Sequence, residues 1–105
     1  MSESERGRKL LGLLGLAMRS GTLAVGTTAV KQMVSRGKNP ILILARDAGD
    51  GQLIRIRRLE PVAGIVDDVL DRADLAAALG RNDLVVVGVA DPGFVHGIRK
   101  IITGS

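Results

Sequence analysis

The sequence has no cysteine, no tryptophan and no tyrosine, and Phe94 is its only aromatic residue. Without cysteine the chain forms no disulfide, thiolate nucleophile, cysteine zinc site or iron–sulfur cluster. With a single aromatic ring it cannot stack a row of bases on aromatic side chains. These absences exclude several common ways of catalysing a reaction, holding a metal or reading a nucleic acid.

The rest of the composition is typical of a folded domain. Of the 105 residues, 46% are hydrophobic and 25% are charged. A chain of this length can bury about two-thirds of its unfolded surface. No repeat, low-complexity tract or linker divides the sequence. We therefore predict one domain over residues 6–105, preceded by a disordered segment over residues 1–5.

Charge is distributed unevenly along the chain. Residues 1–58 hold eleven Lys and Arg and four Asp and Glu, a balance of +7. Residues 59–105 hold four Lys and Arg and seven Asp and Glu, a balance of −3, and the two parts sum to the net charge of +4. A basic side would attract phosphates. An ordinary solvated surface can carry the same charge, so charge alone does not distinguish a phosphate-binding surface from a merely solvated one.

Residues 6–18 imitate a secretory signal, because cations precede a nine-residue apolar run. Arg19 ends this run, acidic residues dilute its positive start, and it is too short to cross a bilayer. Leu10, Leu14 and Ala17 recur at helical spacing. We therefore interpret the segment as an amphipathic helix packed on the core, and expect no membrane partner.

Hydrophobic patterns predict alternating helices and strands. The continuous apolar runs at residues 41–45 and 84–89 are typical of strands buried on both faces, and we place them at the centre of the sheet. Weaker strands are expected over residues 22–25 and 62–69. Helices are expected over residues 6–18, 27–36, 52–59, 72–79 and 92–102. This order predicts an α/β fold, namely a three-layer α/β/α sandwich with a small mixed four-stranded sheet.

The predicted helix ends rest on capping residues. Asp71 and Asp91 are expected N-caps, the first with Asp74 as a weak capping box. Thr27 or Thr28 is expected to cap the second helix. Residues 52–59 also fit an edge strand, because their isoleucines alternate with arginines.

Motifs for cofactors and metals are incomplete. Two glycines at residues 49–51 follow a strand, but Ile54 stands where a dinucleotide loop has its third glycine. The aspartates at 67, 68, 71 and 74 are interpreted as capping and surface residues rather than as a Mg²⁺ site. His96 is the only histidine, so it cannot build a zinc site. We expect no cofactor, no metal and no catalytic residue. A small nucleotide-handling enzyme that uses Asp47 and Asp50 is kept as an alternative.

The strongest functional indication is Gly26, the glycine that leads from the short strand over residues 22–25 into the second helix. Amide groups at a helix start favour an anion. Thr27 and Thr28 add hydroxyl donors there, and Lys31, Arg36 and Lys38 add positive charge on or just beyond the same helix. The same pattern is also compatible with plain helix capping.

Seven segments carry a resemblance in their order and spacing: residues 11–15, 19–21, 26–27, 35–37, 41–45 with Asp47, 75–80 and 91–94. From about Lys9 to Ile102 the chain resembles the bacterial YlxQ-type branch of the L-seven-Ae and L-thirty-e superfamily, ribosomal proteins and kink-turn RNA binders. The resemblance implies a cytoplasmic, non-enzymatic ribonucleoprotein component. Its expected partner is structured RNA, either ribosomal or kink-turn-like, with the ribosome as a further partner.

In relatives that bind kink-turns, the glycine-led helix start holds the RNA. The family pattern has asparagine or lysine, then glutamate or glutamine, and a lysine further along; these positions are Thr28, Ala29 and Gln32 here. Ala29 offers no acceptor for a guanine edge, and Lys31 supplies the nearest ammonium to Gln32. The second contact in relatives is the loop after the fourth helix, here residues 80–83, where Arg81 and Asn82 replace apolar side chains.

We therefore expect RNA to be bound by backbone and charge contacts. The expected RNA-binding residues are Gly26, Thr27, Thr28, Lys31, Gln32, Arg36, Lys38, Arg46, Arg81 and Asn82. The main alternative is a protein-interaction module that kept the fold and lost RNA binding. The sequence leaves the oligomeric state open.

Overall fold

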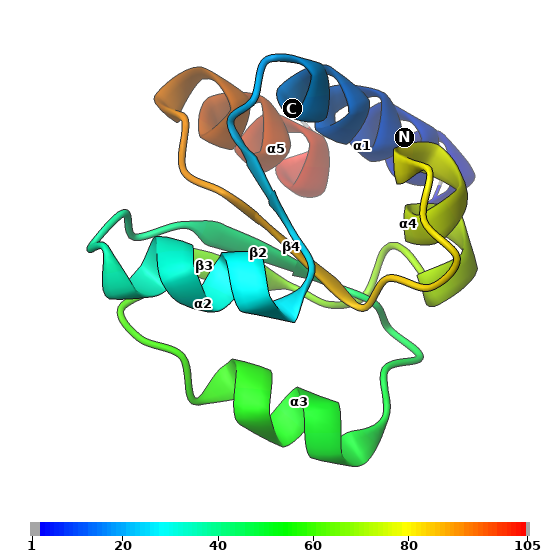
Figure 1. Ribbon diagram of the computed structural model, residues 1–105. Helices are drawn as coiled ribbons and strands as arrows, with labels where there is room; N and C mark the ends of the chain where they lie inside the picture. The colour runs from blue at the N-terminus through cyan, green and yellow to red at the C-terminus, as the bar shows by residue number, and fades with distance from the viewer. Residues whose placement is uncertain (1–2, 105) are drawn as a thin grey trace.

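Five helices and four strands alternate along residues 3–104, the part of the chain that the computed structural model describes. In chain order they are α1 (Glu3–Arg19), β1 (Leu23–Val25), α2 (Thr27–Ser35), β2 (Ile41–Leu44), α3 (Asp50–Arg57), β3 (Gly64–Val66), α4 (Arg72–Leu79), β4 (Val86–Val89) and α5 (Pro92–Thr103). Helices α1, α4 and α5 cover one face of the sheet, and α2 and α3 cover the other (Figure 1). The predicted α/β/α sandwich is confirmed.

The four strands form one mixed sheet in the order β1-β4-β2-β3. Strand β4 is antiparallel to both β1 and β2, whereas β3 is parallel to β2. All residues of the central strands β2 and β4 are buried, as their continuous apolar runs predict. Because β1 and β2 are antiparallel to β4, the residues that end β1 and β2 lie at the same end of the sheet as the first residue of β4. Helix α2 follows β1 and helix α3 follows β2, so both helices begin near that end of the sheet.

Helix α1 packs one face on the core. Leu10 and Leu14 are fully buried and Ala17 is nearly so, which confirms the predicted amphipathic helix. No helix in the described residues is both long enough and apolar enough for a membrane crossing. The helix starts at Glu3 rather than at the predicted residue 6. Of the segment expected to be disordered, residues 1 and 2 lie outside the described residues.

Aspartate caps begin α4 and α5 as predicted. The backbone N–H of Asp74 donates to Oδ1 of Asp71 at 2.9 Å, and the N–H of Asp71 donates back to Oδ2 of Asp74 at 3.3 Å. Asp91 accepts from the backbone N–H groups of Gly93 and Phe94 at 2.9 and 3.2 Å. Both helices therefore have their first amides satisfied by carboxylates.

Helix α2 starts differently. The prediction that Thr27 or Thr28 caps it is wrong, because Gly26 occupies the N-cap position and no side chain accepts from the first turn. Gly26 has φ 89° and ψ 167°, a conformation reached almost only by glycine. A Cβ added there would meet nothing within 4 Å. The glycine is therefore required by the backbone turn and not by crowding within the chain.

A second glycine sets how closely α2 approaches the sheet. A Cβ added at Gly88 in β4 would lie 3.4 Å from the sulfur of Met33 and 3.4 Å from Cγ2 of Val30. Both of these residues belong to α2, and Val30 is fully buried. The bare strand surface thus lets the inner face of α2 pack directly on the sheet, which fixes its outer face toward solvent.

We predict that Gly26→Ala lowers the free energy of unfolding by about 1–3 kcal/mol, because alanine is strained at this positive φ. The matched control is Gly12→Ala, at an exposed helical glycine of α1 that also has open space for a Cβ. That variant should be more stable than wild type by about 0.4–1 kcal/mol. Urea unfolding measures both, and equal midpoints for the two variants would contradict the assigned strain.

Candidate nucleic-acid interface

The amino end of α2 presents backbone donors at the protein surface. The N–H of Gly26 donates to the carbonyl of Val86 at 3.0 Å, and the carbonyl of Gly26 accepts from Val30 N–H at 3.0 Å. The three amides between them, at residues 27–29, precede the first hydrogen bond of the helix, and no side chain caps them. Together with the positive end of the helix dipole, they form a suitable site for an anion.

Two shallow hollows flank α2. The first, of about 220 Å³, is lined by Thr27 and Lys31 of α2 and by Gln52, Arg55 and Ile56 of α3. The second, also of about 220 Å³, is lined by Ala24, Ala29, Gln32, Met33, Arg36 and Lys38. Each hollow therefore contains two cationic side chains, and α2 is the ridge between them.

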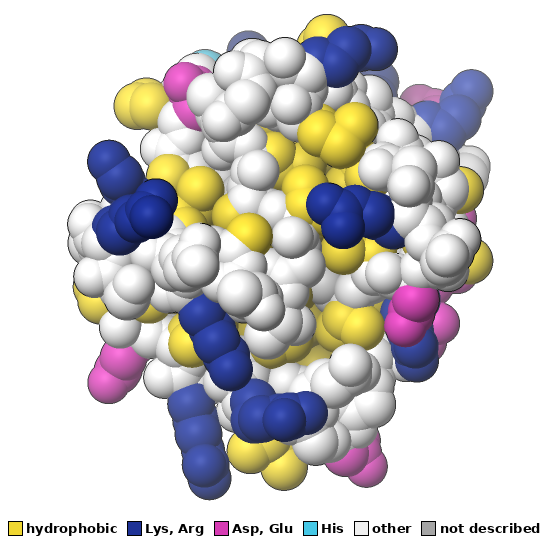
Figure 2. Space-filling view, viewed as in Figure 1, with side chains coloured by type: hydrophobic (Ala, Val, Ile, Leu, Met, Phe, Trp, Pro, Cys, Tyr) yellow, Lys and Arg dark blue, Asp and Glu magenta, His cyan; other side chains and the backbone are white. Residues whose placement is uncertain are grey.

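Negative charge is scarce around this ridge. Residues 6–46 contain eight Lys and Arg and no Asp or Glu. Within the described residues, no ion pair joins Lys31, Arg36 or Lys38 to a carboxylate. Figure 2 shows Lys and Arg side chains gathered over α2 and α3, with Asp and Glu toward the margins of the same face. The charge on this surface is thus available to an external anion.

The predicted site residues do not form one cluster. The structure brings together Gly26, Thr27, Thr28 and Lys31 at the first turns of α2, and Thr28 is exposed there. Arg36 and Lys38 lie at the other end of a nine-residue helix, about 13 Å away at the usual rise per residue. Gln32 joins this second group through its hollow.

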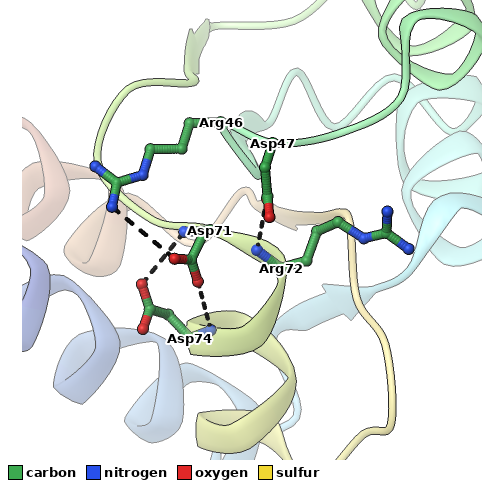
Figure 3. Close-up of polar contacts among 5 residues, drawn as sticks. All are labelled: Arg46, Asp47, Asp71, Arg72 and Asp74. Atoms are coloured by element: carbon green, nitrogen blue, oxygen red, sulfur yellow. Dashed lines mark hydrogen bonds and ion pairs between the residues drawn. The ribbon is translucent and has the colours of Figure 1, made fainter.

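Three further predicted residues lie near the end of the sheet at which α2 begins. Arg81 and Asn82 are exposed in the loop between α4 and β4. Arg46 follows β2, but its guanidinium points toward Asp71 (Figure 3), and its Nη2 lies 3.9 Å from Oδ2 of that residue. It lines a hollow of about 360 Å³ together with residues of α1 and α4, including Arg8 and Asp74. Arg46 therefore belongs with the helices on the opposite face of the sheet from α2.

The carboxylates near Arg46 hold the start of α4. Oδ1 of Asp47 accepts from the backbone N–H of Arg72 at 2.8 Å (Figure 3). Backbone hydrogen bonding from Asp74 lowers the pKa of Asp71. Asp47, which the enzyme alternative would use, is thus engaged in helix capping. Among the described residues, no group of three or more His, Asp or Glu side chains is arranged to hold a metal ion.

A bidentate ion pair ties α4 to the loop that precedes β4. Nε and Nη2 of Arg72 donate to the two carboxylate oxygens of Asp83, at 2.9 and 2.5 Å. This hydrogen bonding lowers the pKa of Asp83 and raises the pKa of Arg72. The pair holds the loop that carries Arg81 and Asn82.

Sequence reasoning missed two residues of α3. Gln52 and Arg55 line the first hollow beside Thr27 and Lys31, although they lie 21 to 28 positions further along the sequence than those two residues. Their spacing of three places them on one face of a helix. That spacing was a usable signal under the helix expected over residues 52–59, which α3 shows over most of their length, but not under the alternative of an edge strand.

Comparison with known proteins places this geometry in context. No family model matches the chain. An RNA-binding protein YlxQ of Enterococcus faecium is 26% identical over 105 residues, spanning 99% of this chain and all of that protein. A protein of unknown function from Bacillus halodurans is 32% identical, with a TM-score of 0.72 over 90% of this chain and 96% of its own.

A second solved structure shares the fold at lower identity. A 15.5kD RNA binding protein of Giardia lamblia is 19% identical, with a TM-score of 0.62 over 95% of this chain and 87% of its own. The chain thus shares its α/β fold with this structure. Over nearly its whole length the chain is thus similar to a protein named YlxQ, in agreement with the family that its sequence resembles.

We predict that Asp83→Asn lowers stability at pH 7 and that its deficit shrinks on acidification. The folded pKa of Asp83 is depressed, so its stabilising contribution is present above the unfolded value of about 3.9 and is lost as pH falls through the folded pKa. Urea unfolding between pH 7 and 3 measures this, with Asp68→Asn at an exposed position as the control. Parallel pH profiles for Asp83→Asn and wild type would contradict the assignment.

Proposed function

We propose that the protein is a non-enzymatic, cytoplasmic RNA-binding protein whose residues 6–105 act as one domain, and that α2 is its RNA-contacting element. The observation that carries this proposal is the start of α2, uncapped by any side chain and set between two hollows that each hold two cations. The name of the Enterococcus faecium relative supports RNA as the ligand class.

Binding would rest on phosphates and RNA shape. Three backbone amides and the hydroxyls of Thr27 and Thr28 are donors, and phosphate oxygens accept from such groups. Lys31, Arg36 and Lys38 add charge attraction along the ridge. With Phe94 as the only aromatic residue, base stacking contributes little. The ligand is therefore a folded RNA that presents closely spaced phosphates rather than a flexible single strand.

The side chains on α2 point to a form of recognition that uses few base contacts. Thr28 is exposed on the ridge, and Ala29 lines the second hollow without any hydrogen-bonding side-chain atom. A guanine edge would find no carboxylate or amide acceptor at that position. We propose ribosomal or kink-turn-like RNA, with or without the ribosome, as the partner. It would be held mainly by its backbone.

A protein-interaction module of the same fold makes a different prediction. It requires an exposed apolar patch and gives binding that is insensitive to salt. The large exposed apolar residues among the described ones are Leu16 and Met18 on α1 and Ile54 on α3. These two helices cover opposite faces of the sheet, so the three residues make no common patch.

We predict that Lys31→Glu weakens RNA binding at least tenfold at low salt, because it replaces a cation at the ridge by an anion. The matched control is Lys100→Glu, the same charge change at an exposed position of α5 on the opposite helical layer. It should alter affinity less than threefold. Fluorescence anisotropy with a kink-turn, a plain duplex and a single strand, each at two salt concentrations, measures both variants.

For wild type, the logarithm of the binding constant should fall with the logarithm of salt concentration by about 0.9 per phosphate neutralised, the value for duplex DNA. Equal losses for the two folded variants would mean that α2 is not the contact. Salt-independent affinity of wild type would favour the protein-interaction module.

A further inference from the structure

The hollow between α2 and α3 has the features of a binding groove for a charged strand. Its lining combines two cations, a hydroxyl and a carboxamide, from Lys31, Arg55, Thr27 and Gln52, above the buried side chain of Ile56. A volume of about 220 Å³ is many times what one water molecule needs, so a phosphate group can enter. No carboxylate lines it.

The two cations reach this hollow from different helices and are both unneutralised. Within the described residues, no ion pair involves Lys31 or Arg55. Both side chains are exposed, one on each wall. Two like charges facing one hollow repel each other, and an anion between them removes that repulsion. This favours a ligand with negative charge at the centre of the groove.

The neighbouring arginine of α3 is placed differently. Arg57 is ion-paired with Asp67, which precedes α4. Positions 55 and 57 lie on opposite sides of a helix, because consecutive residues turn by about 100°. Helix α3 thus presents one free arginine to α2 and one neutralised arginine away from it.

We infer that α3 is a second wall of the RNA site, with Arg55 and Lys31 clamping one phosphate of the bound strand in the hollow between α2 and α3. This rests on the proposed function, and it adds a contact element that α2 alone does not supply. Arg55 offers a planar donor fork suited to phosphate oxygens, Lys31 offers a point charge from the facing wall, and Gln52 adds a neutral donor. The strand then runs from the open amides of residues 27–29 into the groove.

The test compares Arg55→Gln with Arg57→Gln, the same charge loss two residues along α3. Affinity is measured for the RNA that wild type binds best, at two salt concentrations. Arg55→Gln should weaken binding about three- to tenfold and reduce the salt slope by about 0.9, the value for one phosphate. Arg57→Gln should stay within twofold, because its cation is already neutralised by Asp67. Thermal unfolding confirms that both variants are folded.

A double-mutant cycle tests whether the two cations share a phosphate. If they do, Lys31→Gln combined with Arg55→Gln should lose less affinity than the product of the two single losses, since either single change already disrupts the clamp. Strict multiplication would overturn the shared-phosphate contact.

These measurements distinguish failure of the contact by α3 from failure of the proposed RNA binding as a whole. Equal affinity for Arg55→Gln and Arg57→Gln, with Lys31→Gln still weakened, would overturn the α3 wall and leave RNA binding by α2 intact. Absence of salt-dependent RNA binding in wild type would overturn both.

Discussion

The turn at Gly26 is the constraint on which the rest of the surface depends. Its backbone conformation, with positive φ and extended ψ, directs the chain from β1 straight into α2. The hydrogen bond from Gly26 N–H to Val86 fixes that turn to the central strand β4. Because the N-cap residue is a glycine and has no side chain, the helix begins uncapped and its first amides stay available. Because Gly88 has no side chain, the inner face of the same helix packs closely on the sheet, and its outer face carries the exposed cations.

Much of the fold could be predicted because its strongest patterns are local. The apolar runs that become β2 and β4 have only one reasonable environment, a strand covered on both faces. Asp71 and Asp91 identify helix starts by side-chain chemistry alone. Helix α3 was ambiguous, since Ile54 and Ile56 fit alternation as well as helical spacing. Tertiary packing resolves this, because Ile56 is 1% exposed in the core and Ile54 is 53% exposed.

The candidate site was less accessible to sequence reasoning, because it depends on where separate elements meet. Gly26 and the acid-free stretch around it are visible in the sequence, but the absence of a cap is not, since Thr27 or Thr28 was expected to supply one. The involvement of α3 is not, since Arg55 meets Lys31 only after both helices pack on one face of the sheet. Arg46 shows the converse. Its position after β2 suggests a place beside α2, but its side chain turns toward Asp71 at the other helical layer.

The central claim is that RNA contacts the open first turn of α2, and backbone NMR during titration with a structured RNA tests it most directly. The amide signals of residues 27–29 should show the largest shift changes on saturation, with smaller changes across α5 on the opposite face. Saturable RNA binding that leaves these three amides unshifted, while signals elsewhere move, would contradict the claim.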